Sequence, residues 1–336
     1  MTRSTAARRP NGRRLSLAAC VAACGAFVST VSAFAQDRPT HRIGFVAGAG
    51  GFPKMAVTNQ TFFDALAEVG YPHGKVLDVV FRTAEGNMSK MPTLVKEVLD
   101  QNVEILVVSS SPGCAAAKEA TATVPVLCIS VQDDPIKAGL TTSLARGTGN
   151  VVGVHSYLAD GMEQQLGWLQ RLVPDLRSIG VLYNPGNATH VRQLAEWSIL
   201  AEGRKVKVVA MPVASKNDLD PAIKAAKEAQ AQIGIGLLGA DTYALRKEIA
   251  EAARAQGFPI AMDTPGGYTH MGGVATIGVD IVPYYRRGAL EQMVPMLKGI
   301  KPADLAWIGP DKIDVRVNGD VARAFGVQVP AAVPVD

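Results

Sequence analysis

Short apolar runs alternate with longer segments of helical periodicity from residue 42 onward. The first four runs are 42–47, 76–81, 104–108 and 124–130. They are rich in Val, Ile and Leu, which is typical of buried strands. The segments between them carry apolar residues three or four positions apart, as at Phe62, Leu66 and Val69, and so predict helices. Because neighbouring parallel strands need a connection about the size of a helix, this rhythm predicts a parallel sheet with helices on both faces.

The rhythm repeats in the second half of the chain. Strands are predicted at 178–183, 205–210, 233–238, 259–262, 275–279 and 312–317. Helices are predicted at 162–172, 191–203, 219–229, 245–256 and 281–297. The stretch from Gly139 to Tyr157 separates the halves and is rich in glycine, whose backbone freedom suits a hinge. The predicted fold class is therefore α/β, with two doubly wound parallel-sheet lobes and a ligand cleft between them.

The first 35 residues have the composition of a secretory leader. Residues 3–14 contain Arg and no acidic residue, and 15–31 form an apolar run. The sequence Ala-Phe-Ala at 33–35 has the small residues of a signal peptidase site, which makes Gln36 the expected new N-terminus. We therefore expect a signal peptide over residues 1–35 and a periplasmic protein. A membrane anchor is the alternative interpretation of the apolar run.

The cysteines leave two questions open. Cys20 and Cys24 each follow a short motif ending in Ala-Ala, so a lipid anchor through Cys24 is an alternative to the cleaved leader. Cys114 and Cys128 remain in the mature chain, in a compartment where disulfides form. They are predicted on a helix start and on the following strand, and either a disulfide or two buried thiols fits that placement.

Composition and charge narrow the class of protein. A length of 336 residues is sufficient for two domains. Hydrophobic residues make up 48% and charged residues 19%, which excludes a disordered chain. The formal net charge is +4, but the leader supplies five Arg, and without it the charge is about −1. No basis remains for predicting nucleic acid or an anionic membrane as a partner.

Candidate binding residues follow the predicted strands, because ligands of open α/β sheets bind outside the carboxyl ends of the strands. Residues 48–52 offer glycine amides and a ring, and residues 109–111 offer hydroxyls and amides at a helix N-terminus, which suits a carboxylate. Asp241 or Asp263 can hold an ammonium group. The candidate residues are Gly50, Phe52, Ser110, Ser111, Gln132, Asp133, Tyr157, Asn184, Asn187, Asp241 and Asp263. Candidates for the apolar flank of a ligand are Tyr157, Tyr183, Tyr243 and Tyr268.

Several of these residues also have a purely structural explanation. Ser111 before Pro112 is a common helix N-cap. Asn184 and Asn187 can simply close an Asn-Pro-Gly-Asn turn, and Asp241 can cap the helix after it.

Catalytic and cofactor motifs are missing from the sequence. The five His residues are scattered without HxxxH or HExxH spacing, and neither a GxSxG elbow nor a P-loop occurs. The glycines at 48–51 lack the G-x-G-x-x-G spacing of a dinucleotide site. We therefore expect no enzyme, no cofactor and no metal.

Four segments together resemble one family. They are GLTTSLARGTGNVVGVHSY after Asp134-Pro135, LQRLVPDLRSIGVLYNPGN, ATIGVDIVPYYRRGA with LKGIKPADL, and VNGDVARAFGVQVP. The chain resembles ABC transporter substrate-binding proteins of the tryptophan-binding-like branch, which have the type I periplasmic binding protein fold. It departs from that pattern at Asp241-Thr242, where the family has Asp-Asn, and at Asp263-Thr264, where an acidic pair is common.

The resemblance implies three crossovers between the lobes. It assigns 37–152 plus 279–310 to the N-terminal lobe and 153–278 plus 311–336 to the C-terminal lobe. The implied function is capture of a small solute by hinge closure and its delivery to an inner-membrane ABC permease by a monomer. Aromatic residues make up only 6%, which favours an amino-acid-like ligand over a sugar. The resemblance adds aromatic amino acids to the expected ligands, because the family includes binders of them. The alternatives are a sugar or nucleoside binder on the same fold and a ligand-sensing module that reports to a membrane receptor.

Overall fold

The computed structural model describes residues 41–50, 55–263, 267–331 and 333–334. The predicted signal peptide and the candidate residue Phe52 lie outside the described residues. None of the described helices is long and apolar enough to cross a membrane.

The first sheet has the strand order β2-β1-β3-β4-β5, and its neighbouring strands are parallel. The strands are β1 (His41–Ala47), β2 (Leu77–Thr83), β3 (Ile105–Ser109), β4 (Val126–Val131) and β5 (Val151–His155). β3 and β4 are buried along their whole length, because helices cover the sheet and leave no face for water. The continuous apolar runs of the sequence correspond to these strands.

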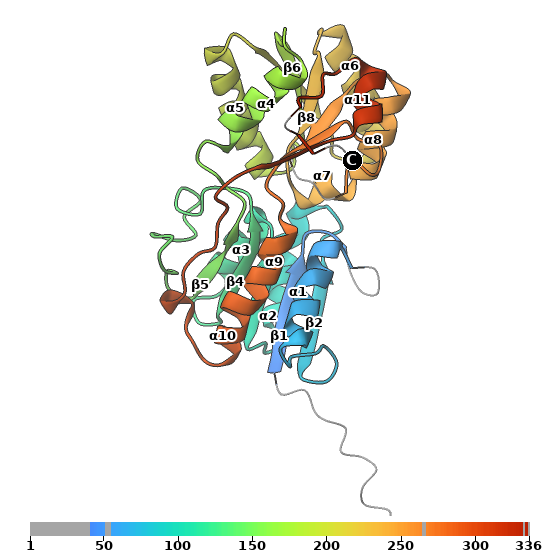
Figure 1. Cartoon of the computed structure of the whole chain (residues 1–336). Coiled ribbons are helices and arrows are strands. Elements are labelled where there is room, and N and C mark those ends of the chain that lie inside the picture. Colours follow the sequence, from blue (N-terminus) through green and yellow to red (C-terminus); the bar gives the residue numbers. More distant parts are fainter. Residues whose placement is uncertain (1–40, 51–54, 264–266, 332, 335–336) are drawn as a thin grey trace, which may run out of the picture. The chain divides into compact units, whose positions relative to one another are not determined.

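Helices pack on this sheet and complete its core. They are α1 (Val57–Glu68), α2 (Met91–Leu99), α3 (Ser111–Ala120), α9 (Val282–Arg287) and α10 (Val294–Leu297). α1 and α9 lie side by side although they are far apart in the sequence (Figure 1). Between α9 and α10 the predicted long helix passes through a π-helical segment, Gly288–Met293. Its residues Ala289 and Met293 are fully buried in the same core as Phe45 and Phe62.

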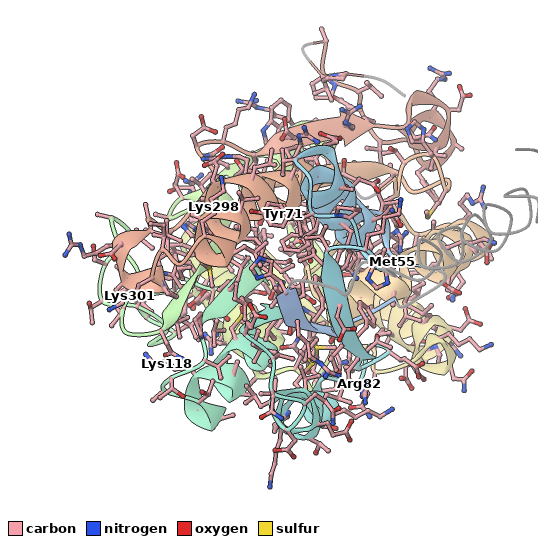
Figure 2. All side chains as sticks on the ribbon, turned by 90° about the horizontal axis from the view of Figure 1, so that it is seen from below. Met55, Tyr71, Arg82, Lys118, Lys298 and Lys301 are labelled. Carbon is pink, nitrogen blue, oxygen red and sulfur yellow. The ribbon has the colours of Figure 1, made fainter. Side chains whose placement is uncertain are left out.

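Basic side chains lie on the surface of the first lobe. Seen from below, the side chains of Arg82, Lys118, Lys298 and Lys301 lie around the outside of the lobe (Figure 2). Inside it, Cys114 and Cys128 are both buried, and in this described part of the chain both are free thiols.

The stretch Gly139–Tyr157, predicted to cross between the lobes, begins in the first lobe. β5 lies within this stretch and pairs with β4, so most of the stretch belongs with the first sheet. The segment around Ile308 lies along β5. Gly153 O accepts from Ile308 N–H at 3.0 Å, and Ile308 O accepts from His155 N–H at 2.9 Å. The chain therefore leaves the first sheet only after His155. The exact lobe boundaries stay a prediction.

The second sheet has the order β11-β10-β9-β8-β6-β7. Its strands are β6 (Ser178–Tyr183), β7 (Lys207–Pro212), β8 (Ile233–Gly236), β9 (Ile260–Met262), β10 (Ala275–Gly278) and β11 (Asp314–Val317). The expectation of a wholly parallel lobe needs one correction, because β11 pairs with β10 in the antiparallel direction. An edge strand that enters from the other lobe has no helical crossover to make it parallel.

Helices also cover the second sheet. They are α4 (Gly161–Leu172), α5 (Ala188–Gly203), α6 (Leu219–Glu228), α7 (Ala240–Ala244), α8 (Arg246–Ala255) and α11 (Gly319–Phe325). Trp197 and Leu237 belong to one core cluster of this lobe, and Tyr268 belongs to another. Tyr268 is fully buried and its hydroxyl donates to Ile260 O at 2.9 Å, so the expectation that it flanks a ligand is wrong.

Candidate functional site

Two cavities among the described residues lie where the strands of both sheets end. The larger has a volume of about 510 Å³ and the smaller of about 40 Å³. Gln132 of the first lobe and Leu238 of the second line both of them. Ligand sites of drug-sized molecules typically measure about 300–1,000 Å³, so the larger cavity is the candidate site.

The larger cavity brings together four of the predicted residues. Gln132, Asp133, Tyr157 and Asp263 all line it. They come from the loop after β4, from the segment after β5 and from the end of β9. These positions are strand carboxyl ends, as the sequence argument required.

One wall of this cavity is apolar. Met162, Leu200 and Ile313 line it and pack against the second-lobe core that contains Trp197. The cavity lining is therefore amphipathic, because carboxylates, amides and the cations Lys137 and Arg192 line it together with these aliphatic groups.

Asp263 places a carboxylate in this cavity without full pairing. Its Oδ1 is buried and has no hydrogen-bond partner among the described residues. Leu238 N–H donates to the carboxylate, but burial outweighs that bond and raises the pKa of Asp263 to about 7. A positively charged group beside Asp263 would stabilise the ionised form and lower that pKa.

Asp133 is engaged by the opposite lobe. Its Oδ2 accepts a hydrogen bond from Thr189 Oγ1 at 2.8 Å, and its Oδ1 pairs with Arg192 Nη2. Thr189 and Arg192 lie in the first turns of α5. Asp133 thus contacts α5 directly, at a helix N-terminus that favours an anion.

The smaller cavity is lined by hydroxyl groups of the first lobe. Ser110 lines it, and Ser110 Oγ caps α3 by accepting from Gly113 N–H at 3.3 Å. Tyr285 lines it too; its hydroxyl is bonded to Ser130, Thr58 and Ser109, and burial raises the pKa of Tyr285 to about 12.

Ser111 lines neither cavity. Its N–H and Oγ–H both donate to Gln132 Oε1, at 3.3 and 3.2 Å, and its Oγ accepts from Gln132 N–H at 3.0 Å. The helix-end amide that was expected to face a ligand is therefore occupied by Gln132.

Gly50 has a local structural role. It lines neither cavity, and its φ of +74° is in the left-handed region. A Cβ at this position would lie 2.8 Å from Ala56 N, so the turn after β1 requires glycine.

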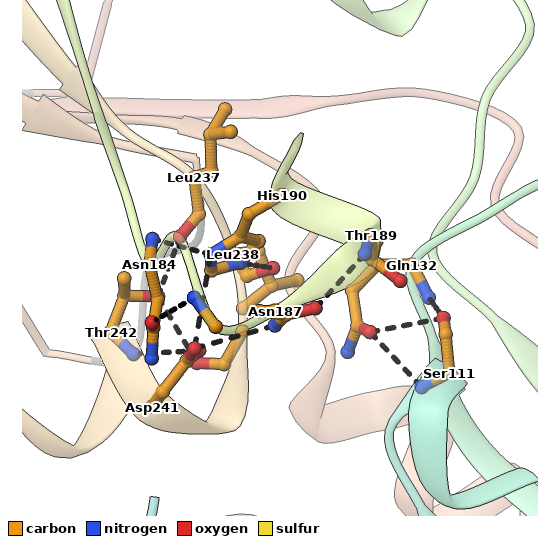
Figure 3. A network of polar contacts seen from close by, with 12 residues as sticks. Ser111, Gln132, Asn184, Asn187, Thr189, His190, Leu237, Leu238, Asp241 and Thr242 are labelled. Carbon is orange, nitrogen blue, oxygen red and sulfur yellow. Dashed lines mark hydrogen bonds and ion pairs between the residues drawn. The ribbon is translucent and has the colours of Figure 1, made fainter. Parts of the chain in front are cut away.

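Asn184, Asn187 and Asp241 meet in a buried network around His190 (Figure 3). His190 Nδ1 accepts from Asn184 N–H at 3.0 Å and His190 Nε2–H donates to Leu238 O at 3.0 Å. The partners thus assign the neutral Nε2–H tautomer. His190 was passed over by the sequence argument, which sought metal or catalytic spacing and found none.

The same network satisfies the Asp241 carboxylate. Its Oδ2 accepts from Asn187 Nδ2 at 3.3 Å and its Oδ1 accepts from Thr242 N–H at 3.0 Å. Asn184, Asn187 and Asp241 line neither of the two cavities. Their roles as ligand contacts stay predictions, whereas their contacts with each other fix the loops after β6 and β8.

Sequence reasoning missed Gln193 and Trp197. Both lie on α5, line the larger cavity and carry a buried polar atom that has no partner within the described ranges. The signal that could have found them is their spacing of four residues, which places them on one helix face.

Comparisons with known proteins agree with this architecture. The profile of the family described as "ABC transporter substrate binding protein" matches residues 51–336. The "Tyrosine-binding protein" of Clostridioides difficile is 24% identical over 279 residues, which cover 82% of this chain and 78% of that protein. A conserved domain protein from Vibrio cholerae is 25% identical, with a TM-score of 0.77 over 87% of this chain and 97% of that one. The ABC domain in complex with L-Trp from Streptococcus pneumoniae is 24% identical, with a TM-score of 0.75 over 88% and 97%.

The predicted fold class, two α/β lobes of the type I periplasmic binding protein kind, is confirmed by these structures. The family match extends from residue 51 to residue 336 and includes all the residues that line the larger cavity. The chain belongs to the family of ABC transporter substrate-binding proteins.

Proposed function

We propose that the chain captures a small amino-acid-type solute between its two lobes and delivers it to the permease of an ABC importer. The ligand carries an ammonium group, and its side chain lies on the apolar wall of the larger cavity. The chain acts by binding and performs no chemical step on the solute.

The observation that carries this proposal is the carboxylate of Asp263. It lines a cavity of about 510 Å³, and its buried Oδ1 has no partner among the described residues. A buried carboxylate with an unpaired oxygen and no counter-charge is unfavourable, and a ligand ammonium group would supply the missing donor and charge. Met162, Leu200 and Ile313 would take the hydrophobic part of the ligand.

The relatives support the ligand class. One of them is named a tyrosine-binding protein, and a solved structure of similar fold contains L-Trp. Both ligands combine an ammonium group with a bulky side chain, which is the combination that the walls of this cavity suit.

Closure of the lobes is the proposed mechanism. A ligand that contacts residues of both lobes favours the closed arrangement, because only that arrangement makes all of the contacts. Gln132 and Asp133 from the first lobe and Asp263 from the second line one cavity and would make such contacts. Export by the predicted leader would place this event in the periplasm, next to the permease.

A thermal-shift screen tests the proposal. The mature chain is mixed with single amino acids, nucleosides and sugars, and a ligand at 100 times its Kd stabilises the folded state by about 2.7 kcal/mol. We expect one or more amino acids to raise Tm by several degrees, and Asp263→Asn to abolish most of the rise. Sugars or nucleosides as the only hits would overturn the ligand class.

Small-angle scattering tests closure separately. The amino acid found in the screen should decrease the radius of gyration of the wild-type chain at saturation. A ligand that binds without any change in the scattering profile would contradict the hinge mechanism and leave the ligand class intact.

A further inference from the structure

Two side chains on one face of α5 line the larger cavity and carry buried polar atoms that have no partner in the described part of the chain. Gln193 Oε1 and Trp197 Nε1 are buried and have no hydrogen-bond partner among the described residues, and both side chains line the cavity. The exposed fraction is 9% for Gln193 and 0% for Trp197. Residues four positions apart on a helix are neighbours on its surface, so the two side chains are neighbours where α5 borders the cavity.

Other polar groups of this helix are satisfied within the protein. Thr189 donates to Asp133, His190 donates to Leu238 O, and Ser198 donates to Leu194 O. Among the buried polar side chains of α5, Gln193 and Trp197 are thus the two left with an unpaired atom in the described part of the chain. Burying such atoms without a partner is unfavourable, and a bound group that pairs with them removes that cost.

The chemistry of the two atoms restricts what can satisfy both. An indole N–H only donates and an amide oxygen only accepts. An ammonium group cannot accept from Trp197, and a carboxylate cannot donate to Gln193. A hydroxyl group can accept from the indole and donate to the amide at the same time, whereas an apolar group satisfies neither.

We propose that Gln193 and Trp197 recognise a hydroxyl group on the side chain of the ligand. The ligand class is then a hydroxyl-bearing amino acid in preference to its counterpart without the hydroxyl. Trp197 Nε1–H donates to the hydroxyl oxygen, and the hydroxyl proton is donated to Gln193 Oε1. This inference rests on the proposed function, with Asp263 holding the ammonium group.

Calorimetric titration with matched amino-acid pairs tests it. The pairs are tyrosine and phenylalanine, threonine and valine, and serine and alanine, each differing in the hydroxyl group. In the pair whose size fits, we expect the hydroxyl member to bind at least about tenfold more tightly, since a site built for a hydroxyl rejects the analogue that lacks one. Gln193→Leu should reduce this ratio to about twofold or less.

The matched control is Ile199→Ala on the same helix. Ile199 is 74% exposed and lines neither cavity, so this variant should keep the wild-type preference. Equal affinity of wild type for both members of every bound pair, or an unchanged preference in Gln193→Leu, would overturn the inference while the proposed function stands. Absence of binding by all amino acids would overturn both.

A second measurement covers the case in which Trp197→Phe does not fold. The chain has three Trp residues, so its indole N–H resonances can be assigned in a nitrogen-15 spectrum with Trp168→Phe and Trp307→Phe. The hydroxyl-bearing ligand should shift the Trp197 indole proton downfield, and the matched ligand without the hydroxyl should not. The same shift with both ligands would contradict the assignment.

Discussion

The carboxylate of Asp133, just after β4 in the first lobe, accepts a hydrogen bond of 2.8 Å from the Thr189 hydroxyl at the start of α5 in the second lobe. Arg192 from the same helix pairs with the other carboxylate oxygen. Both oxygens of Asp133 thus bind groups of the opposite lobe, and Asp133 is only 8% exposed. These bonds can exist only while the lobes are in contact, so they favour closure whether or not a ligand is bound.

Removal of the Thr189 hydroxyl should therefore shift the ligand-free chain toward an open form. Thr189→Val keeps the shape and deletes one hydrogen bond of about 1 kcal/mol, which lowers the closed-to-open ratio roughly fivefold. Scattering of the ligand-free variant should give a larger radius of gyration than wild type. Ser198→Ala is the control, since it deletes a hydroxyl that bonds only within α5. An identical radius of gyration in ligand-free Thr189→Val and wild type would show that the Asp133–Thr189 hydrogen bond does not favour the closed form.

Binding should depend on pH through Asp263. Its pKa of about 7 lies above the usual value of 3.8 because burial disfavours the charge. An ammonium ligand needs the ionised carboxylate, so affinity should rise with pH up to about 7 and then level off, until the ligand amine itself loses its proton. Calorimetry across pH 5 to 8 measures the rise. The control is Asp263→Asn, whose weaker binding should show no such rise.

Stability of the ligand-free chain should change in the opposite direction. An acid whose pKa is raised in the folded state holds its proton there more tightly than in the unfolded state. Its contribution is therefore fully present below about pH 4 and is lost as the pH rises through about 7. Asp263→Asn should thus be more stable than wild type at pH 8, with the difference disappearing below pH 4. A variant less stable than wild type at pH 8 would contradict the raised pKa of Asp263.

The strand-end rule accounts for what the sequence could predict of the site. Gln132, Tyr157 and Asp263 line the larger cavity because parallel strands deliver the residues that follow them to one edge of the sheet. The rule predicts at which edge of the sheet a side chain lies, but it does not predict which hydrogen-bond partner that side chain finds. It could not tell that Asp263 Oδ1 remains unpaired while both oxygens of Asp241 are bonded, to Asn187 and Thr242. That difference depends on contacts between loops that are distant in the sequence.

Non-local pairing also explains the errors in the fold. The glycines of the stretch Gly139–Tyr157 suggest a hinge, yet Gly153 in β5 lies where a Cβ would be 2.3 Å from Cys128 O, so glycine is required there by close strand packing. The glycine pattern alone does not separate a flexible link from a crowded strand. Gln193 and Trp197 escaped attention because their importance depends on which partners they lack, and no local pattern records that.

Ser110 combines a helix cap with an unfavourable backbone conformation. Its φ of 90° and ψ of 148° are rare for a residue with a side chain, and its hydroxyl caps Gly113 N–H. Ser110→Gly should relieve strain of about 1 kcal/mol while costing only a few tenths for the cap, so the variant should be as stable as wild type or more stable. Ser110→Ala keeps the strain, loses the cap and should be about 1 kcal/mol less stable. Urea unfolding of the two variants checks this order of stability. A free energy of unfolding for Ser110→Ala equal to or above that of Ser110→Gly would refute it.

His190 should be a major determinant of stability. It is fully buried and bonds Asn184 N–H on one side and Leu238 O on the other. His190→Leu removes both bonds and leaves two buried backbone groups unpaired, each worth about 1–3 kcal/mol, so the loss should be about 2–5 kcal/mol. His190→Gln retains an N–H donor for Leu238 O and should lose less. Urea unfolding measures both variants; a His190→Leu chain as stable as His190→Gln would show that these bonds do not hold the loop after β6 in place.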